Sequence, residues 1–530
     1  MQLSGYGWAL IAFCIFFLLL STYLRRYIKT LEDYYVMGWR ATWPLVAGTT
    51  AATVISAVTF LANPGLAATW GWGAWYPGWF GVYAGVLLIG CSIGVFFRRL
   101  KCITLVDFFA RRYGNDKAVT AGVVLTMTVG MIFYLAAQFI GGGWLLSQYL
   151  GIPREVAILA FAVLMLICVI LGGMWSVVLS DFISISVMVC AMVLLLPLTV
   201  SIVGGFQAGI ASSIAARPLA WTALGASGKD YTWVVGNILS WFAIFSASPH
   251  ILSRALIAKT EKDIYKGFAL GLFLMNLMVI FLFIAFTMLG GYYFIPELVM
   301  REKIATDAIP LVAMARLFPF AFGIMYVLGI FNATWSTANT QLAVTSQFGG
   351  RDLYGRYINP KASERRIISY TMIFALIYAF ISIWLAISWP GTIAFLCLFI
   401  GVIFSCGLLP AIILSCFAKL STKAAALLIW IGLPISLFMS ITYQIWNWFY
   451  PHPAFYGPFI GFGLGGLLYA LIKPTARDLQ LYAEFKQATA RSAEPETFTM
   501  KDKVEVIIIL IASIALIAGA FSITLPYLPP

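Results

Sequence analysis

Long apolar stretches separated by short polar segments run along the whole chain. Stretches of about 20 apolar residues, the length that a helix needs to cross a bilayer, recur about fourteen times. The predicted spans are residues 7–24, 43–69, 74–97, 118–149, 154–172, 173–202, 231–250, 267–293, 311–347, 366–387, 390–417, 424–446, 453–472 and 504–526. The pattern predicts an all-α polytopic membrane protein with about 14 transmembrane helices, several of them long enough to require tilt or kinks.

Composition agrees with this pattern. Of the 530 residues, 62% are hydrophobic and only 10% are charged, whereas a soluble domain carries about 25% charged residues. The longest polar stretch, residues 474–503, is too short to fold alone. We expect it to be a solvated cytoplasmic loop that includes a short surface helix, with a regulatory docking segment as the alternative.

The net charge of +13 follows from the distribution of basic residues along the chain. If the N-terminus lies outside, 27 of the 33 Lys and Arg residues fall in loops on the cytoplasmic side. This is the positive-inside pattern. It predicts a multi-pass protein of the inner or plasma membrane with both termini outside. The scattered charges form no contiguous basic patch, so we expect no nucleic acid partner.

Two of the predicted spans are interrupted by small hydroxyl residues and proline. The second span contains a Thr- and Ser-rich run at 49–59 and then Pro64, and the seventh contains Ser246, Ser248 and Pro249. Proline removes a helical hydrogen bond. Because the two spans lie five apart, they match the first helices of two five-helix repeats, which an odd number of spans makes inverted. Paired broken helices of this kind indicate a binding site near the middle of the membrane.

An oxygen-rich cluster, ATWSTANT at 333–340, lies within the apolar span 311–347. Hard cations are bound by oxygen ligands, and the Ala333 carbonyl and the Ser336 and Thr337 hydroxyls can converge on one side of a helix. The carbonyls of Ala52 and Ile55 become available if the second span opens there. The alternative is that the hydroxyls bond back to the preceding turn or join helices together.

Asp181 is a carboxylate within an apolar span, and such residues are costly in a bilayer and commonly functional. It is predicted to bind a second cation or a proton, or else to pair with a helix end or with Arg254. Gln138 is predicted either to bond a solute or to join helices. The tryptophans at 70, 72, 75 and 79 are expected to form an interfacial belt, with an aromatic cage for a quaternary ammonium group as the alternative. No catalytic or nucleotide-binding motif is present in the sequence, so we expect no enzyme.

Several segments match a known family in order and spacing. They read TLEDYYVMG at 30–38, ISAVTFL at 55–61, TLVDFFARRYG at 104–114, GGMWSVVLSD at 172–181, RALIAK at 254–259, STANT at 336–340 and DLY at 352–354. With these segments the chain resembles the sodium:solute symporter family. That family includes bacterial proline, pantothenate, sialic acid and galactose transporters and animal sodium–glucose and iodide carriers.

The resemblance implies a LeuT-type core of two inverted five-helix repeats, at 43–202 and 231–417. A leading helix and loop (1–42), an extracellular loop (203–230) and three peripheral helices (418–530) complete the predicted organisation. The implied sodium ligands are Ala52, Ile55, Ala333, Ser336 and Thr337. A second cation is implied at Asp181, Asn339 and Thr340, although Asn339 stands where many members have Asp or Ser.

The resemblance also implies where the solute binds. Ser56 and Thr59 match substrate-contacting positions of the first core helix, next to Phe60. Trp241 and Ile244 occupy positions that are polar or aromatic in sugar carriers, and the Ile departs from that pattern. With Gln138, these residues form the predicted solute site.

The expected function is sodium-coupled import of a small polar organic solute by alternating access, with the chain acting as a monomer. Organic acids, amino acids, sugars and ammonium osmolytes all remain open as solutes. The alternatives are a proton-coupled carrier that uses Asp181 and a membrane sensor that binds a solute without transporting it.

Overall fold

Helices make up nearly all of the secondary structure in the computed structural model, which describes residues 4–73, 75–222, 224–293, 301–389, 393–446, 448, 452–490 and 498–524. The α-helices are α1 Gly5–Leu24, α2 Leu31–Val36, α3 Trp43–Val54, α4 Asn63–Trp70, α5 Gly78–Leu88, α6 Gly94–Arg99, α7 Leu105–Arg112, α8 Lys117–Leu150, α9 Arg154–Ile202, α10 Phe206–Ala216, α11 Tyr231–Ala247, α12 Pro249–Leu256, α13 Glu261–Leu289, α14 Ile309–Arg316, α15 Phe320–Gln347, α16 Glu364–Ser388, α17 Ile393–Ile403, α18 Leu409–Phe417, α19 Thr422–Trp446, α20 Pro453–Leu471, α21 Ala476–Thr489 and α22 Met500–Thr524. Shorter π or 3₁₀ segments include η3 Val58–Ala62, η4 Ile89–Ile93, η6 Thr306–Ala308, η7 Phe348–Ile358 and η8 Phe404–Leu408.

The membrane-spanning helices include two that are bent. Within the described residues, 11 helices are long and apolar enough to cross a membrane, or up to 13 if each bent pair is one span. The first pair, α3 with the segment Val58–Trp70, bends by 57°, and the second, α11 with α12, bends by 42°. These breaks fall in the two spans whose Ser, Thr and Pro residues predicted an interruption. At the second break Ser248 has extended backbone, as expected for a residue before proline.

Helix α9 reverses direction at Gly173. A straight helix of its 49 residues would be about 74 Å long, far more than a bilayer thickness. However, the Phe161 ring lies 6.3 Å from the Phe331 ring, and a Cβ on Gly329 would lie 3.4 Å from Ala191. Both arms of α9 therefore meet the same turn of α15. Gly173 has φ +46°, and a Cβ there would lie 2.7 Å from the Tyr34 ring, so the reversal requires glycine.

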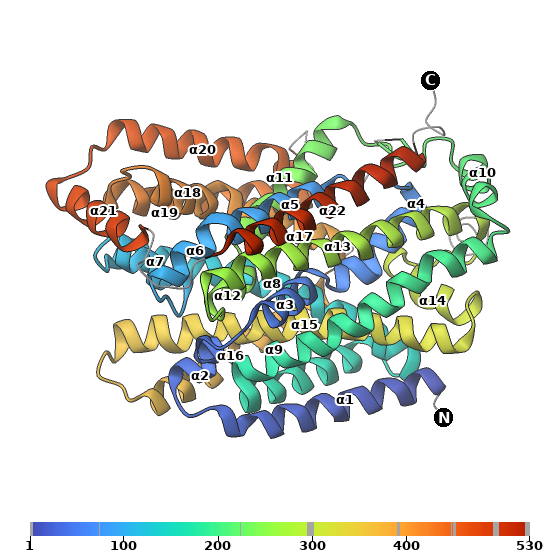
Figure 1. The fold of residues 1–530 in the computed structure, drawn as a ribbon, viewed down its shortest axis with the longest axis horizontal. Helices are drawn as coiled ribbons and strands as arrows, with labels where there is room; N and C mark the ends of the chain where they lie inside the picture. Colours follow the sequence, from blue (N-terminus) through green and yellow to red (C-terminus); the bar gives the residue numbers. More distant parts are fainter. Residues whose placement is uncertain are drawn as a thin grey trace.

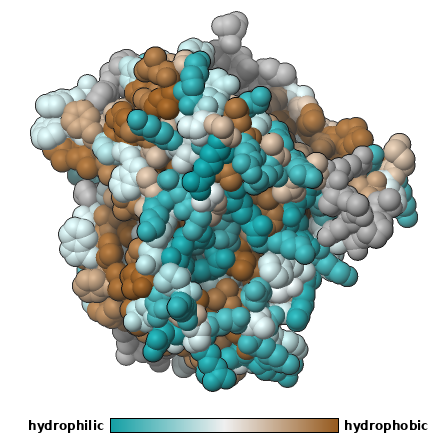
Figure 2. Space-filling view, turned by 90° about the vertical axis from the view of Figure 1, so that its left-hand side faces the viewer, coloured by the Kyte–Doolittle hydropathy of each residue, from teal (hydrophilic) through white to brown (hydrophobic). Residues whose placement is uncertain are grey.

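The helices lie side by side with loops gathered at two ends (Figure 1). Helix α1 begins, and α22 ends, toward the right of that view, whereas α2, α7 and α21 lie at the left. Hydrophilic residues gather over that left-hand end (Figure 2). The family-like segment 104–114 meets the residues that flank the segment 352–354, because Asp107 of α7 pairs with Arg351 at 2.8 Å and Arg356 at 2.7 Å. Burial raises the pKa of the Asp107 carboxyl, whereas the two arginines lower it. The net effect is a lowered pKa, which keeps the carboxylate ionised.

The prediction of an interfacial belt is wrong for three of the four tryptophans. Trp72, Trp75 and Trp79 are 2%, 1% and 6% exposed. The Trp72 backbone N–H donates to the Ala220 carbonyl at 2.8 Å, the Trp75 ring lies 6.2 Å from the Trp233 ring, and Trp79 lines a cavity inside the protein. These indoles pack inside the protein rather than against lipid headgroups.

The polar segment 474–503 contains the expected surface helix. Thr475 and Asp478 form a capping box at the start of α21, which satisfies the free N–H groups of its first turn. Residues 491–497 of the segment lie outside the described residues.

Candidate functional site

The break after α3 exposes backbone carbonyls. Ile55, the residue that follows α3, has extended backbone (φ −74°, ψ 112°), and its N–H donates to the Ala51 carbonyl at 3.0 Å. The carbonyls from Ala52 onward lose their partners within the helix. They also carry the negative end of the helix dipole. These carbonyls face α15.

Two adjacent hydroxyls of α15 meet these carbonyls. The Ser336 hydroxyl lies 2.7 Å from the Ala52 carbonyl oxygen and 3.2 Å from that of Ala333. The Thr337 hydroxyl lies 3.1 Å from the Ala333 oxygen and 3.3 Å from the Ile55 oxygen. All five residues of the predicted sodium site are therefore brought together, and all are fully buried.

The cluster also contains the Thr53 carbonyl, 3.2 Å from the Thr337 hydroxyl, which the sequence did not predict as a ligand. The two hydroxyls can donate only two protons, yet four carbonyl oxygens lie within reach. The pocket therefore has more acceptors than donors in a buried environment. A monovalent hard cation would balance this surplus.

Asp181 is paired with Arg254, as the alternative interpretation of that carboxylate expected. The two side chains are fully buried, with 3.3 Å between the guanidinium nitrogen and the carboxylate oxygen Oδ2. The same oxygen accepts hydrogen bonds from Thr49 at 2.5 Å and Thr53 at 3.3 Å. All three contacts are with Oδ2, and the other carboxylate oxygen, Oδ1, has no hydrogen-bond partner among the described residues.

Of the other two residues of the predicted second cation site, Thr340 contacts the same arginine and Asn339 contacts Ser180. Thr340 accepts a hydrogen bond from Arg254 at 3.3 Å. The Asn339 amide lies 3.4 Å from the Ser180 hydroxyl. Arg254 supplies a positive charge beside Asp181, whereas Asp181 Oδ1 and Asn339 Oδ1 are buried without a hydrogen-bond partner among the described residues. The second cation site stays a prediction.

A small central cavity of about 10 Å³ lies beside the break in the first bent span. Its lining residues are Val54, Ser56, Val58, Thr59, Asn63, Trp79, Val82, Tyr134, Trp241 and Phe245. A volume of this size holds about one water molecule. The cavity is therefore closed tightly around the position where a solute was expected.

Three of the six predicted solute residues, Ser56, Thr59 and Trp241, line this cavity. The other three do not. Phe60 packs on Tyr326 with 5.5 Å between ring centroids, and Ile244 is buried outside the lining. Gln138 accepts a hydrogen bond from the Ala57 N–H at 3.1 Å, so it holds the broken helix in place.

Sequence reasoning did not predict the other seven lining residues, of which four have polar or aromatic side chains: Asn63, Trp79, Tyr134 and Phe245. Two of them carried a signal. Asn63 precedes Pro64 in the interrupted span, and Tyr134 lies one helical turn before Gln138 on the same face of α8.

Comparison with known proteins agrees with this geometry. The model of the sodium:solute symporter family matches residues 34–432. The sodium/pantothenate symporter of Haemophilus influenzae is 28% identical over 381 residues, which cover 70% of this chain and 76% of that protein. The sodium/proline symporter of the same organism is 25% identical over 454 residues, or 80% of this chain and 86% of that protein.

Among solved structures, the outward-open, substrate-bound state of a Na⁺-coupled sialic acid symporter superposes with a TM-score of 0.75. That match covers 89% of this chain and 98% of the other, at 20% identity, and it shows the LeuT-type fold. The family model and these relatives describe transporters rather than enzymes. The chain therefore belongs to the sodium:solute symporter family, as a multi-pass membrane protein whose co-transported ion is sodium.

Proposed function

We propose that this symporter imports a small polar organic solute and binds its sodium ion at Ala52, Ile55, Ala333, Ser336 and Thr337. The observation that carries the proposal is the convergence of the α15 hydroxyls on the free carbonyls of α3. Sodium bound there would hold the end of α3 against α15. Binding energy at this seam favours the state that is competent for solute.

The proposed architecture has fourteen spans, since the reversal at Gly173 makes α9 two of them. The spans form two inverted five-helix repeats, 43–202 and 231–417. The segments 1–42, 203–230 and 418–530 flank the repeats, and the chain acts as a monomer. The distribution of basic residues favours an orientation with both termini outside. The start of α1 and the end of α22 lie toward the same end of the molecule (Figure 1), which supports this proposal.

We further propose that one sodium ion drives each cycle. Arg254 compensates Asp181, so the set of Asp181, Asn339 and Thr340 does not need a second ion. A membrane potential of about 100 mV contributes about 2.3 kcal/mol per sodium, and a tenfold gradient adds about 1.4 kcal/mol. Together they support roughly 500-fold accumulation of solute.

The lining of the central cavity favours a solute without net charge. Ser56, Thr59 and Asn63 offer neutral polar groups, and Trp241 and Phe245 offer aromatic faces. No charged residue is among its described lining residues. This composition suits neutral or zwitterionic solutes better than free anions, whose burial without a cationic partner is costly.

Uptake into proteoliposomes tests the proposal. A panel of labelled solutes, including proline, pantothenate and glucose, would be offered with and without an inward sodium gradient. We expect at least one solute to accumulate only with sodium, and the double variant Ser336→Ala, Thr337→Ala to lose at least tenfold of that stimulation. Thr334→Ala is the matched control, because the Thr334 hydroxyl bonds to the Ile330 carbonyl of its own helix.

Retention of full sodium stimulation in the double variant would show that the ion binds elsewhere. Uptake driven by a pH gradient without sodium, and lost in Asp181→Asn, would instead support proton coupling. Solute binding without transport would support the alternative that the protein is a membrane sensor.

A further inference from the structure

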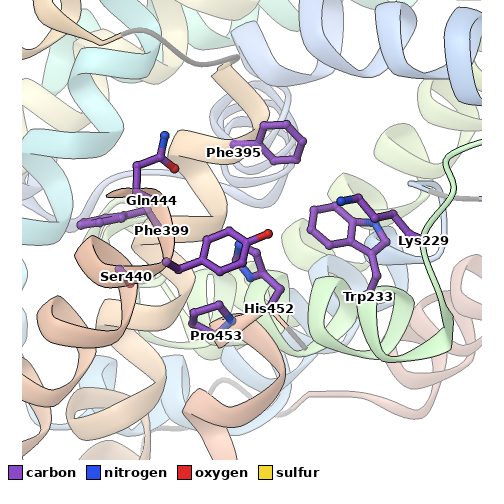
Figure 3. A pocket seen from close by; sticks show the side chains of 9 residues that line it. Lys229, Trp233, Phe395, Phe399, Ser440, Gln444, His452 and Pro453 are labelled. Atoms are coloured by element: carbon purple, nitrogen blue, oxygen red, sulfur yellow. The ribbon is translucent and has the colours of Figure 1, made fainter. Parts of the chain in front are cut away.

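A second and larger cavity lies between α11, α17, α19 and α20, away from the central one. Its volume is about 190 Å³, enough for several waters or a small organic molecule. It is lined by Lys229, Trp233, Phe395, Phe399, Ser440, Tyr443, Gln444, His452 and Pro453 (Figure 3). None of these residues lines the central cavity.

Two buried donors in this cavity have no partner in the part of the chain that the structure describes. They are the Ser440 hydroxyl and the Trp233 indole N–H, on side chains of residues that are each 5% exposed. Burying a polar group without a hydrogen-bond partner is unfavourable. A ligand that supplies acceptors on both sides would remove that cost, because Ser440 lies across the cavity from Trp233 (Figure 3).

Lys229 supplies a positive charge at one side of the cavity. The Lys229 ammonium lies 5.3 Å from the centroid of the Trp233 ring. The neighbouring Asp230 carboxylate accepts hydrogen bonds from the Trp233 backbone N–H at 3.2 Å and from Thr232 at 2.5 Å, which caps α11. Burial, with a smaller effect of Lys229, lowers the pKa of His452 to about 3, so its imidazole is neutral.

Aromatic side chains form the remaining walls. Phe395 and Phe399 lie on α17, and the His452 ring lies 4.4 Å from the Tyr443 ring and 5.4 Å from the Trp233 ring. Flat apolar walls of this kind favour a ring-shaped ligand body. A carboxylate would lie at Lys229 and the Trp233 N–H, and a hydroxyl would reach Ser440.

We propose that this cavity binds a small hydroxylated aromatic monocarboxylate as a regulatory ligand, separate from the transported solute. The ligand bridges α11 and α17 of the second repeat to the peripheral helices α19 and α20. A ligand that joins these helices restrains their relative movement and slows the transport cycle.

Trp75 contacts residues that line each of the two cavities. Its ring lies 6.2 Å from Trp233 and 6.5 Å from Phe395, both of which line the outer cavity. Its indole N–H donates to Asn63 of the central cavity at 2.7 Å. The effect on uptake rests on the proposed symport, whereas the binding of the aromatic acid does not.

The binding experiment uses the full chain in nanodiscs, titrated with 4-hydroxyphenylacetate, its neutral amide and phenylacetate. We expect the acid to bind at least tenfold more tightly than the amide. Lys229→Gln should remove this preference and leave amide binding within twofold. Ser440→Ala should weaken 4-hydroxyphenylacetate at least threefold and leave phenylacetate unchanged. Lys303→Gln, which removes an exposed lysine outside the cavity, is the charge-matched control.

Equal affinity for the acid and the amide in the unmodified protein, or an unchanged preference in Lys229→Gln, would overturn the site. In proteoliposomes, 4-hydroxyphenylacetate should lower the maximal uptake rate at least twofold without raising the solute KM. Binding without that effect would overturn the regulatory role alone. If no solute is transported at all, the titration still decides the site, so the two proposals fail separately.

Discussion

Thr53 belongs to two polar clusters at once. Its carbonyl lies 3.2 Å from the Thr337 hydroxyl of the candidate sodium site, and its own hydroxyl donates to Asp181 at 3.3 Å. A movement at the end of α3 therefore changes both the ion pocket and the donors around the Asp181–Arg254 pair. This single residue provides a physical connection through which the two clusters can be coupled.

The first prediction concerns the buried pair itself. Arg254→Met leaves the Asp181 carboxylate buried without a cationic partner, and Asp181→Asn leaves the guanidinium unpaired. Each single change should cost about 3–5 kcal/mol of stability. The double variant should cost clearly less than the sum, because it removes both charges. Unfolding of the solubilised protein by denaturant measures all three.

The control for these three variants is Arg316→Met, which breaks the exposed ion pair with Glu302. Exposed pairs contribute little, so no change in unfolding is expected. If the double variant lost as much stability as the two single variants together, the two charges would not compensate one another.

The sequence predicted the ion pocket better than the solute cavity. Ser336 and Thr337 stand out because hydroxyls are rare in apolar spans, and the break near Ile55 was signalled by small residues and proline. The Thr53 carbonyl could not be singled out from the sequence, since every residue has a backbone carbonyl. Phe245 could not be identified because aromatic side chains are common throughout this chain, and only the packing of separate helices shows which ones meet. Trp79 was named only as one of four tryptophans in the alternative of an aromatic cage, and it is the one of the four that lines the cavity.

Among the helices, the reversal inside α9 gives the second prediction. Gly173 has φ +46° and ψ −145°, a conformation that is essentially restricted to glycine. Gly173→Ala should lower stability by about 1–3 kcal/mol from backbone strain, with a further loss from the clash with Tyr34. The midpoint of thermal unfolding in detergent measures the change.

Gly463→Ala is the matched control. Gly463 lies in α20, and a Cβ added there would meet nothing within 4 Å, so alanine should be neutral or stabilise the helix by about 0.5–1 kcal/mol. If the two substitutions had equal effects, the turn at Gly173 would not depend on glycine.

The third prediction concerns Asp307, which joins η6 to α17. Its carboxylate accepts a hydrogen bond from the Ile393 N–H at 3.1 Å. Burial raises the pKa of Asp307 to about 6, against smaller lowering effects of that bond and of Arg154. The folded protein then holds the proton more tightly than the unfolded chain. Stability should be greatest below pH 4 and fall by about 3 kcal/mol as the pH rises through 6.

Thermal-shift measurements between pH 4 and 8 test this dependence. Asp307→Asn keeps an acceptor for the Ile393 N–H but cannot titrate. It should therefore remove the part of the pH dependence of stability that Asp307 contributes in this range. An unchanged slope in the variant would assign the pH dependence to other groups.

Hydrophobic periodicity predicted most of the helices because a bilayer requires long apolar segments. It even placed a boundary at Gly172–Gly173, where two consecutive glycines interrupt the apolar run. The tryptophans at 72, 75 and 79 show its limit. A belt in the membrane interface and a buried cluster of tryptophans have the same sequence pattern. The contact of Trp72 with Ala220, which helps to distinguish them, joins residues that are distant along the chain.

At the scale of the whole molecule, the number of sodium ions per cycle is the fourth prediction. With one sodium and a neutral solute, the logarithm of the accumulation ratio should rise with the sodium driving force with a slope of one. The slope is measured in proteoliposomes by varying the sodium gradient and the membrane potential independently. A slope of two would mean that two sodium ions are transported per cycle, and would support the second cation site at Asp181, Asn339 and Thr340.

The contacts of Ser336 and Thr337 with backbone carbonyls have one more consequence for a working carrier. Sodium is held by oxygen lone pairs, so both O–H bonds must rotate away from the carbonyls as the ion arrives. After the ion leaves, the same two hydrogens return and act as placeholders between the helices. In the proposed cycle, the empty carrier can therefore return with two hydroxyl donors still shared among these carbonyl oxygens.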